Sequence, residues 1–412
     1  MIMNKDKEFG LLGEHLSHSF SPLIHSQLAD YPYALYEVAR ESLGEWVKGN
    51  DLSGYNVTIP YKQEIMKYCD EISDVAQRIG AVNTVVRRED GTLFGDNTDY
   101  YGFAYMLSKL GADIKGKKAV VLGSGGASKT VQAVLTEQGA EVIVISRSGD
   151  NNYDNISNHK DAFLLVNTTP VGMYPDCPKS PVDLKTFENL QGVCDVIYNP
   201  AKTALLLQAE KLSIPYVNGL SMLVAQAKRA AEIFTSAEID ASVVERIERK
   251  ISYQTKNIVL VGMPGSGKST VGKLVAEVLG RELADSDEEI KRVTRTSASE
   301  IIKSKGEREF RKTETQVLAD ICKESSLVIA TGGGAVTVAS NKDLLKQNSV
   351  VVFIDRDVNL LATDDRPLSV NLSELYEKRL PMYEDFADIK VDGNKSTRAV
   401  ADDIIKAFKE VL

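Results

Sequence analysis

The chain has 412 residues, enough for about three domains that each bury a core. A formal net charge of −9 excludes a broad nucleic-acid-binding surface, because such a surface needs clustered lysine and arginine. The four cysteines are scattered, without a CxxC pair or partner histidines, so we expect free thiols in a reducing compartment. The first residues carry no apolar signal stretch and no segment approaches about 18 apolar residues, so we expect a cytoplasmic protein without a membrane span.

Apolar patterns divide the first part of the chain into two α/β lobes. Short strand candidates alternate with helical patterns, and a fresh strand at 119–122 then opens a second pattern. We expect the first lobe to span residues 1–105 and to be completed by a helix within 220–250. The second lobe, 106–219, is expected to have a Rossmann-like sheet.

A third unit begins after a short linker. The charged amphipathic stretch 241–250 is expected to be the closing helix of the first unit, and 251–256 is expected to be the linker. The apolar strand at 258–261 opens another parallel-sheet pattern. We expect residues 257–412 to form an α/β domain of the P-loop NTPase type.

In the first lobe, polar residues gather where predicted strands end. A strand at 9–13 is followed by Ser19 and Ser21, which could simply cap a helix. Lys62 alone would be expected on the solvated surface, and Asp99 alone would be expected to cap the next helix. Their setting favours a site, because each lies in a polar loop at a strand end. These loops span residues 18–22, 56–62, 80–84 and 95–99.

The strand at 119–122 leads into a glycine turn whose backbone N–H groups can bind a phosphate at a helix N-terminus. The turn lacks the lysine that a nucleoside triphosphate needs. The next strand ends at Ser146 and Arg147, without the acid that meets the ribose 2′-hydroxyl of NAD. An arginine with hydroxyls suits the 2′-phosphate of NADPH, although Arg147 could instead pack over adenine and leave the preference mixed. The turn residues expected to bind the cofactor are Gly123, Ser124, Gly125, Gly126 and Ala127.

A second glycine turn follows the strand at 258–261 and fits GxxxxGK[ST]. Lys268 is placed to reach the β- and γ-phosphates, and Ser269 is placed to bind Mg²⁺. The motif predicts an ATP or GTP site and leaves the acceptor open. The residues expected to bind the nucleotide are Gly262, Gly265, Ser266, Gly267, Lys268, Ser269 and Thr270.

Further motifs follow this turn in a specific order. Asp285 and Asp287 come after a short apolar stretch and could be a helix N-cap, and the three glycines at 332–334 could be merely a loop. Together, the motifs resemble shikimate kinase across nearly all of residues 256–412. They are Asp285-Ser286-Asp287, 306–314, Gly332-Gly333-Gly334, Arg366-Pro367-Leu368 and 379–383.

The resemblance to shikimate kinase implies a role for each matched residue. Asp285 is implied to bind the metal, and Asp287 to hold the substrate hydroxyls and take the proton from the attacking one. Arg311 and Arg379 are implied to grip the shikimate carboxylate, for which planar cations are suited. Arg366 is implied to close on the phosphates. The backbone of Gly332, Gly333 and Gly334 is implied to approach the substrate.

Alternatives remain for the kinase residues. Arg311 could form a surface ion pair with Glu307 or Glu314, or Glu314 could orient it; Arg379 could lie on a solvated helix face. The segment 360–365 looks shorter than the usual lid and lacks an upstream arginine, so we expect weaker ATP binding. A gluconate- or adenylate-type kinase is the rival assignment.

The first half resembles shikimate dehydrogenase over roughly residues 8–247. Besides the polar loops above, the matching motifs are 167–173, 195–200 and 219–227. The resemblance implies that Lys62 and Asp99 are the catalytic pair, and that Gly219 lies at the cofactor. The residues implied to bind the substrate are Ser19, Ser21, Thr58, Asn83, Gln226 and the nearby Tyr198.

Two consecutive reactions follow from the two resemblances. Hydride transfer to a ketone creates an alkoxide, and a lysine held by an aspartate can supply its proton. The implied reactions are reduction of 3-dehydroshikimate by NADPH and phosphorylation of the resulting shikimate by ATP with Mg²⁺. An NAD-dependent quinate or shikimate dehydrogenase is one alternative. A catalytically silent first half is another, because the short stretch 148–166, with a loop at 150–155, indicates a trimmed cofactor lobe.

Overall fold

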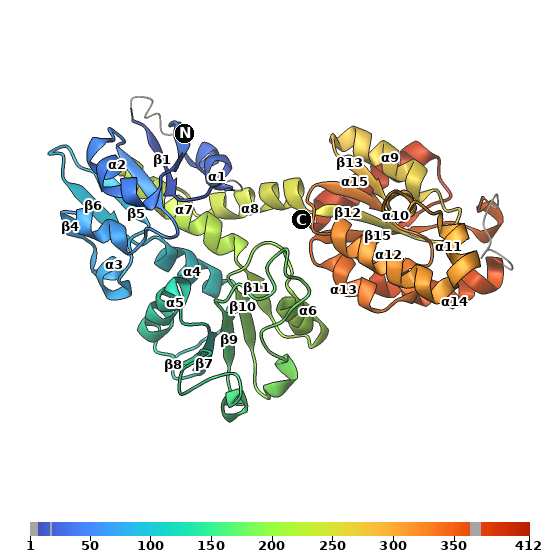
Figure 1. Cartoon of the computed structure of the whole chain (residues 1–412), viewed down its shortest axis with the longest axis horizontal. Helices are drawn as coiled ribbons and strands as arrows, with labels where there is room; N and C mark the ends of the chain where they lie inside the picture. Colours follow the sequence, from blue (N-terminus) through green and yellow to red (C-terminus); the bar gives the residue numbers. More distant parts are fainter. Residues whose placement is uncertain (1–6, 17–18, 363–371) are drawn as a thin grey trace. The chain divides into compact units, whose positions relative to one another are not determined.

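The computed structural model describes residues 7–16, 19–362 and 372–412. They form two compact units. The two units together contain three separate sheets, and helices pack on each sheet (Figure 1). None of the helices within these described ranges is long and apolar enough to cross a membrane. Unit 1 comprises residues 1–171, 179–198 and 208–248, and unit 2 comprises 172–178, 199–207 and 249–412.

The first sheet of unit 1 has six strands in the order β2-β1-β3-β5-β6-β4. β1, β2 and β3 are parallel, whereas β5 runs antiparallel to both β3 and β6. Three of the polar loops predicted from the sequence follow β1, β3 and β6, whereas the loop at 80–84 lies between α3 and the start of β5. Because β5 is antiparallel to β3, its start lies at the same edge of the sheet as the end of β3. The strands are Phe9–Gly13, Tyr33–Glu37, Gly54–Val57, Glu71–Ile72, Thr84–Arg87 and Leu93–Asp96 for β1 to β6.

Helices cover this sheet and join it to the second one. α4 packs along α7, and the contact is close because a Cβ on Gly102 would lie 2.6 Å from the Met222 carbonyl oxygen. This packing brings α7 to the first lobe, where the sequence predicts a completing helix. The helices are α1 (Ser21–Leu28), α2 (Leu43–Gly49), α3 (Asp74–Ile79), α4 (Asp99–Ser108) and α7 (Leu220–Thr235).

The second sheet has five parallel strands in the order β11-β10-β9-β7-β8. The chain crosses from β8 to β9 through a single 3₁₀ turn, Ile156–His159, and residues 150–155 form the loop that the sequence predicts. β7 lies between β8 and β9, so the first glycine turn follows the strand where the order reverses. The elements are β7 (Lys118–Leu122), α5 (Gly126–Glu137), β8 (Glu141–Ile145), β9 (Leu164–Asn167), β10 (Gly192–Asp195), α6 (Ala204–Lys211) and β11 (Tyr216–Asn218).

The predicted linker is part of a helix. α8 runs from Ser242 to Thr255, whereas the sequence led us to expect the helix to end at residue 250. Ile251 is buried and continues the apolar spacing of Val244 and Ile247, so the helix gains core contacts beyond that point. β12 follows almost immediately, at Asn257.

The third sheet, in unit 2, has five parallel strands in the order β13-β14-β12-β15-β16. On β12, Ile258 and Leu260 face one apolar cluster while Val259 and Val261 face another, as expected for a parallel sheet with helices on both faces. The strands are β12 (Asn257–Val261), β13 (Glu282–Asp285), β14 (Leu327–Ala330), β15 (Ser349–Asp355) and β16 (Ile389–Asp392). The helices are α9 (Lys268–Leu279), α10 (Ser286–Thr294), α11 (Ala298–Lys305), α12 (Glu307–Ile321), α13 (Ser340–Lys346), α14 (Leu372–Phe386) and α15 (Thr397–Val411).

Candidate active sites

Unit 1 contains a cavity of about 600 Å³ at the ends of β1, β3 and β6. Lys62 lies in the turn after β3, and Asp99 is the first residue of α4. Lys62 Nζ lies 2.6 Å from Asp99 Oδ2, with the two side chains 29% and 19% exposed. Thr98, not Asp99, is the N-cap residue of α4. Lys62 is therefore not a freely solvated surface lysine, and Asp99 is not the cap of α4.

The other residues predicted to bind the substrate line the same cavity. Ser21 begins α1, whose N-cap is Phe20, and the Ser19 hydroxyl oxygen accepts the Ser21 backbone N–H at 3.2 Å, so Ser19 also serves the start of this helix. Tyr198 lies edge-on to Phe20, and burial raises the pKa of Tyr198. The predicted lining residues are Ser19, Ser21, Thr58, Asn83, Tyr198 and Gln226, together with Gly219 and Ala127 of the cofactor set.

Thr98 organises two of these side chains and was missed from the sequence. Its backbone N–H donates to Asn83 Oδ1 at 2.7 Å, and its hydroxyl lies 3.3 Å from Gln226 Oε1. Asn83 Oδ1 is occupied by these bonds, and no partner of the Asn83 amide nitrogen is found among the residues that the structure describes, so its N–H groups can serve a ligand. Thr98 is fully buried. The sequence gives no sign of this burial, because Thr98 is a hydrophilic residue next to Asp99 and such residues are mostly exposed.

The first glycine turn is open to a ligand. Gly123 has a φ of +103°, and Ser124, Gly125 and Gly126 are exposed at the N-terminus of α5. A Cβ on Gly125 or Gly126 would meet no other atom within 4 Å. Backbone N–H groups at a helix start favour phosphate, so the turn fits a dinucleotide.

At the end of β8, the predicted 2′-phosphate site is held by the following loop. The backbone N–H of Ser146 donates to the Asn151 carbonyl oxygen at 3.1 Å, and Arg147 is exposed. Tyr153 lies close enough to Arg147 for the guanidinium to oppose the effect of burial, which raises the Tyr153 pKa. The loop therefore leaves Arg147 accessible after β8, the edge strand that lies next to β7 and its glycine turn.

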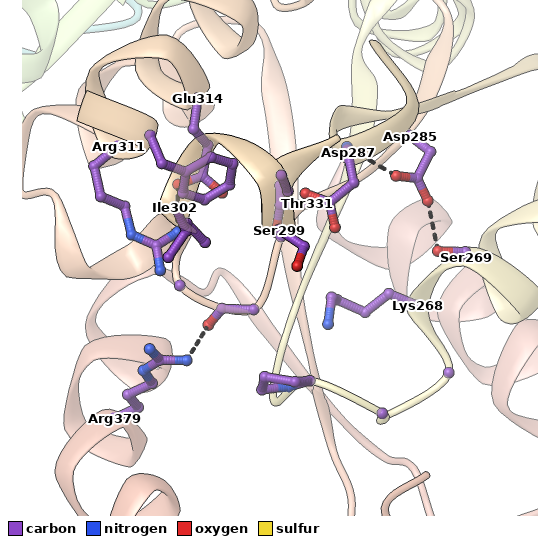
Figure 2. Close-up of a pocket in the computed structure, with 18 of the residues that line it drawn as sticks. Lys268, Ser269, Asp285, Asp287, Ser299, Ile302, Arg311, Glu314, Thr331 and Arg379 are labelled. Atoms are coloured by element: carbon purple, nitrogen blue, oxygen red, sulfur yellow. Dashed lines mark hydrogen bonds and ion pairs between the residues drawn. The ribbon is translucent and has the colours of Figure 1, made fainter. Parts of the chain in front are cut away.

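Unit 2 contains a cavity of about 320 Å³ that brings the predicted kinase residues together (Figure 2). Its walls come from the P-loop, the ends of β13 and β14, and helices α12 and α14. The predicted residues that line it are Gly265, Gly267, Lys268, Ser269, Thr270, Asp285, Asp287, Arg311, Gly332, Gly333, Gly334 and Arg379. Arg366 and the lid segment that follows residue 362 lie outside the described residues.

In the phosphate loop, Lys268 is placed to bind an anion, and Ser269, next to Asp285, is placed to bind a cation. Lys268 Nζ donates to the carbonyl oxygens of Gly262 and Met263, each at 2.9 Å, so its ammonium lies inside the loop. Ser269 Oγ lies 2.5 Å from Asp285 Oδ2. The other oxygen of Asp285 accepts the Asp287 N–H at 3.0 Å, so Asp285 is also the predicted N-cap of α10. The capping and metal-site interpretations of Asp285 are compatible.

Arg311 forms ion pairs with both Glu307 and Glu314, but it is largely buried rather than at the surface. Its Nη1 donates to Glu314 Oε2 at 2.7 Å and its Nη2 to Glu307 Oε1 at 3.1 Å. Glu314 is fully buried and Arg311 is 11% exposed. Burial raises the pKa of Glu314, against the opposing effect of Arg311. For Arg311, burial acts to lower the pKa, but the two ion pairs outweigh it and raise the pKa. The orienting role for Glu314 fits this geometry.

Arg379 and the glycine turn form the far wall of the cavity. Arg379 Nη1 donates to the Gly333 carbonyl oxygen at 3.1 Å, as does the Tyr383 hydroxyl at 2.5 Å. Arg379 is only 6% exposed, so a solvated helix face is the wrong interpretation. A Cβ on Gly334 would lie 2.0 Å from Arg311 Nη2, so any larger residue would force the guanidinium to move.

Comparison with known proteins identifies unit 1. A family model described as the shikimate dehydrogenase substrate binding domain matches residues 11–85. A shikimate dehydrogenase (NADP(+)) of Clostridium beijerinckii is 42% identical over 253 residues, covering 56% of this chain and 93% of the relative. The chain belongs to the shikimate dehydrogenase family. Its resemblance to that family is confirmed.

Solved shikimate dehydrogenases share the fold. A chorismate mutase/shikimate 5-dehydrogenase fusion protein from Clostridium acetobutylicum is 40% identical, with a TM-score of 0.58 over 60% of this chain and 97% of the other. The shikimate 5-dehydrogenase of Thermus thermophilus, solved with NADP(H) and shikimate, is 33% identical, with a TM-score of 0.54 over 59% of this chain and 99% of the other.

The C-terminal part of the chain is similar to a different family. A shikimate kinase family model matches residues 264–409. This member of the shikimate dehydrogenase family therefore carries a shikimate kinase domain, and the predicted α/β fold class is confirmed for both parts.

Proposed function

We propose that this chain catalyses two consecutive steps, the NADPH-dependent reduction of 3-dehydroshikimate and the ATP-dependent phosphorylation of the shikimate formed. The dehydrogenase is assigned to residues 1–105 with 220–250 and to the cofactor lobe at 106–219, and the kinase to 257–412. The observation that carries the proposal is the pairing of Lys62 with Asp99 in a cavity lined by amides and hydroxyls.

In the reduction, NADPH supplies a hydride when bound along the first glycine turn. The residues assigned to it are Gly123, Ser124, Gly125, Gly126, Ala127, Ser146, Arg147 and Gly219. Lys62 donates a proton to the carbonyl oxygen, and Asp99 holds the ammonium 2.6 Å away in a fixed direction. Asn83 donates its amide hydrogens to a substrate oxygen, because its carbonyl is already bonded to Thr98.

In the phosphorylation, Arg311 and Arg379 bind the carboxylate of shikimate, and Asp287 accepts a hydrogen bond from the hydroxyl that attacks. Mg²⁺, held by Ser269 and Asp285, neutralises charge on the transferred phosphoryl group when bound. Lys268 binds the phosphate oxygens from inside the loop. Arg366 is assigned to close on the same phosphates. Gly262, Gly265, Ser266, Gly267 and Thr270 complete the nucleotide set.

A coupled assay tests both steps on one preparation. The chain is supplied with 3-dehydroshikimate, NADPH and ATP, and NADPH loss and ADP formation are followed together. We expect both signals, with ADP appearing after a lag that added shikimate removes. Absence of NADPH oxidation, with ADP formation intact on added shikimate, would establish a silent first half. Faster reduction of 3-dehydroshikimate with NADH than with NADPH, or, in the reverse direction, faster oxidation of quinate than of shikimate with NAD⁺, would establish the other alternative.

A further inference from the structure

A second cavity of about 190 Å³ lies on the other side of the phosphate loop in unit 2. It shares Gly265, Gly267 and Thr270 with the cavity that holds the kinase residues. Its remaining walls include Arg356, directly after β15, and Lys395, just before α15. The phosphate loop therefore separates two compartments, and only the first contains Asp285 and its neighbours.

Arg356 in this second cavity has no protein partner within the described ranges. Its Nε is buried without a hydrogen bond, and no ion pair of its guanidinium is found among the described residues. Two other arginines of the kinase site that the structure describes are engaged, Arg311 by two glutamates and Arg379 by a carbonyl oxygen. Lys395 pairs with Asp403 at 2.7 Å. A buried donor that lacks a partner is unfavourable unless a ligand satisfies it.

The position of Arg356 indicates which part of a nucleotide it meets. A Cβ on Gly267 would lie 3.6 Å from Arg356 Nη1, so the guanidinium reaches the loop itself. Lys268 and Ser269 serve the β- and γ-phosphates and the metal on the acceptor side. The rest of the nucleotide must then pass the start of α9 at Thr270 into the second cavity. Its first charged group is the α-phosphate.

We propose that Arg356 binds the α-phosphate of ATP and so anchors the nucleoside end of the substrate. This inference rests on the proposed kinase function and adds a residue to its nucleotide site. A guanidinium offers five N–H donors and binds phosphate through two of them at once. Arg356 is the only lysine or arginine in the segment 356–362.

Binding of ADP to the full chain tests the proposal by calorimetry in the presence of Mg²⁺. Arg356→Ala is expected to raise the Kd for ADP by about tenfold to a hundredfold, the loss typical of a hydrogen bond to a charged group. Arg356→Lys keeps the charge and is expected to retain more affinity than Arg356→Gln, which is planar but neutral. The matched control is Arg292→Ala, which removes only an exposed ion pair with Glu289 and should leave the Kd unchanged.

Two outcomes would overturn the proposal. One is an ADP Kd for Arg356→Ala within twofold of the wild type, with thermal unfolding showing that both are folded. The other is Arg356→Gln binding ADP better than Arg356→Lys, which would indicate stacking on the base. Turnover of shikimate by the wild type is measured separately. An Arg356-dependent Kd without such turnover would remove the kinase assignment and keep the nucleotide contact.

Discussion

Lys62 Nζ and Asp99 Oδ2 lie 2.6 Å apart, although 37 positions separate the two residues in the chain. The turn after β3 supplies the lysine and the first residue of α4 supplies the aspartate. Both are partly exposed to one cavity, so a proton on the lysine can reach a bound substrate. This relationship is the basis of the first prediction.

Lys62→Ala should lower kcat for the reduction of 3-dehydroshikimate by at least about a hundredfold, because the proton donor is lost. The KM should change much less. Both constants are obtained from initial rates of NADPH oxidation, measured over a range of 3-dehydroshikimate concentrations. Lys67→Ala is the matched control, since Lys67 is an exposed lysine in the 3₁₀ turn Glu64–Tyr68, which follows Lys62. Kinase turnover of the same preparation reports on folding. A near-normal kcat for Lys62→Ala would remove the catalytic role.

Metal removal should separate the two activities. The Ser269 hydroxyl donates a hydrogen bond to the Asp285 carboxylate at 2.5 Å, so both oxygens lie within reach of one cation, whereas the dehydrogenase cavity needs no metal for proton donation. Excess EDTA is expected to abolish ADP formation and to leave NADPH oxidation unchanged. Added Mg²⁺ should restore ADP formation. Kinase turnover that persists in EDTA would contradict the assignment of the metal site.

Gly334→Ala should weaken shikimate binding by the kinase. The new Cβ would lie 2.0 Å from Arg311 Nη2, so the guanidinium must leave its position between Glu307 and Glu314. We expect the KM for shikimate to rise by about tenfold with a smaller change in the KM for ATP, because a charged hydrogen bond to the carboxylate is lost. Initial rates over both substrates measure this. Gly49→Ala, where the added carbon meets nothing within 4 Å, is the control and should have no effect.

Acid should destabilise unit 1 through His25. This side chain is 1% exposed, its ring stacks on Tyr33, and burial lowers the pKa to about 3. The folded state therefore binds fewer protons than the unfolded state between pH 6.5 and about 3, and the free energy of unfolding falls as pH falls through that window. The loss between pH 7 and 5.5 should be about 1 kcal/mol.

The His25 contribution is measured by urea unfolding at the two pH values in wild type and in His25→Gln. Trp46 is the chain's only tryptophan and packs on Tyr36 and Tyr55, so its fluorescence reports on unit 1. Other titrating groups contribute to both proteins alike. The variant should lose about 1 kcal/mol less than the wild type on acidification. Equal losses would show that His25 is not responsible.

Short-range patterns explain what could be predicted. The P-loop, the first glycine turn and the strands before them are contiguous, so spacing and apolar runs identify them. Helix ends are less certain: α8 continues to Thr255 because Ile251 is buried, and burial depends on residues far away in the chain. The three-glycine turn was expected near the substrate, and its contact with Arg311 gives the steric reason for glycine.

The two glycine turns, the α/β pattern, both family resemblances and the residue types of each site follow from the amino-acid order alone. How those side chains are held depends on the folded chain. Thr98 orients Asn83, Glu314 holds Arg311, Arg379 is buried rather than solvated, and Arg356 reaches the phosphate loop from a different strand. The physical reason is that burial, ion pairing and steric fit depend on atoms brought together across long separations. A linear pattern records composition and spacing, and these contacts arise when strands and helices pack.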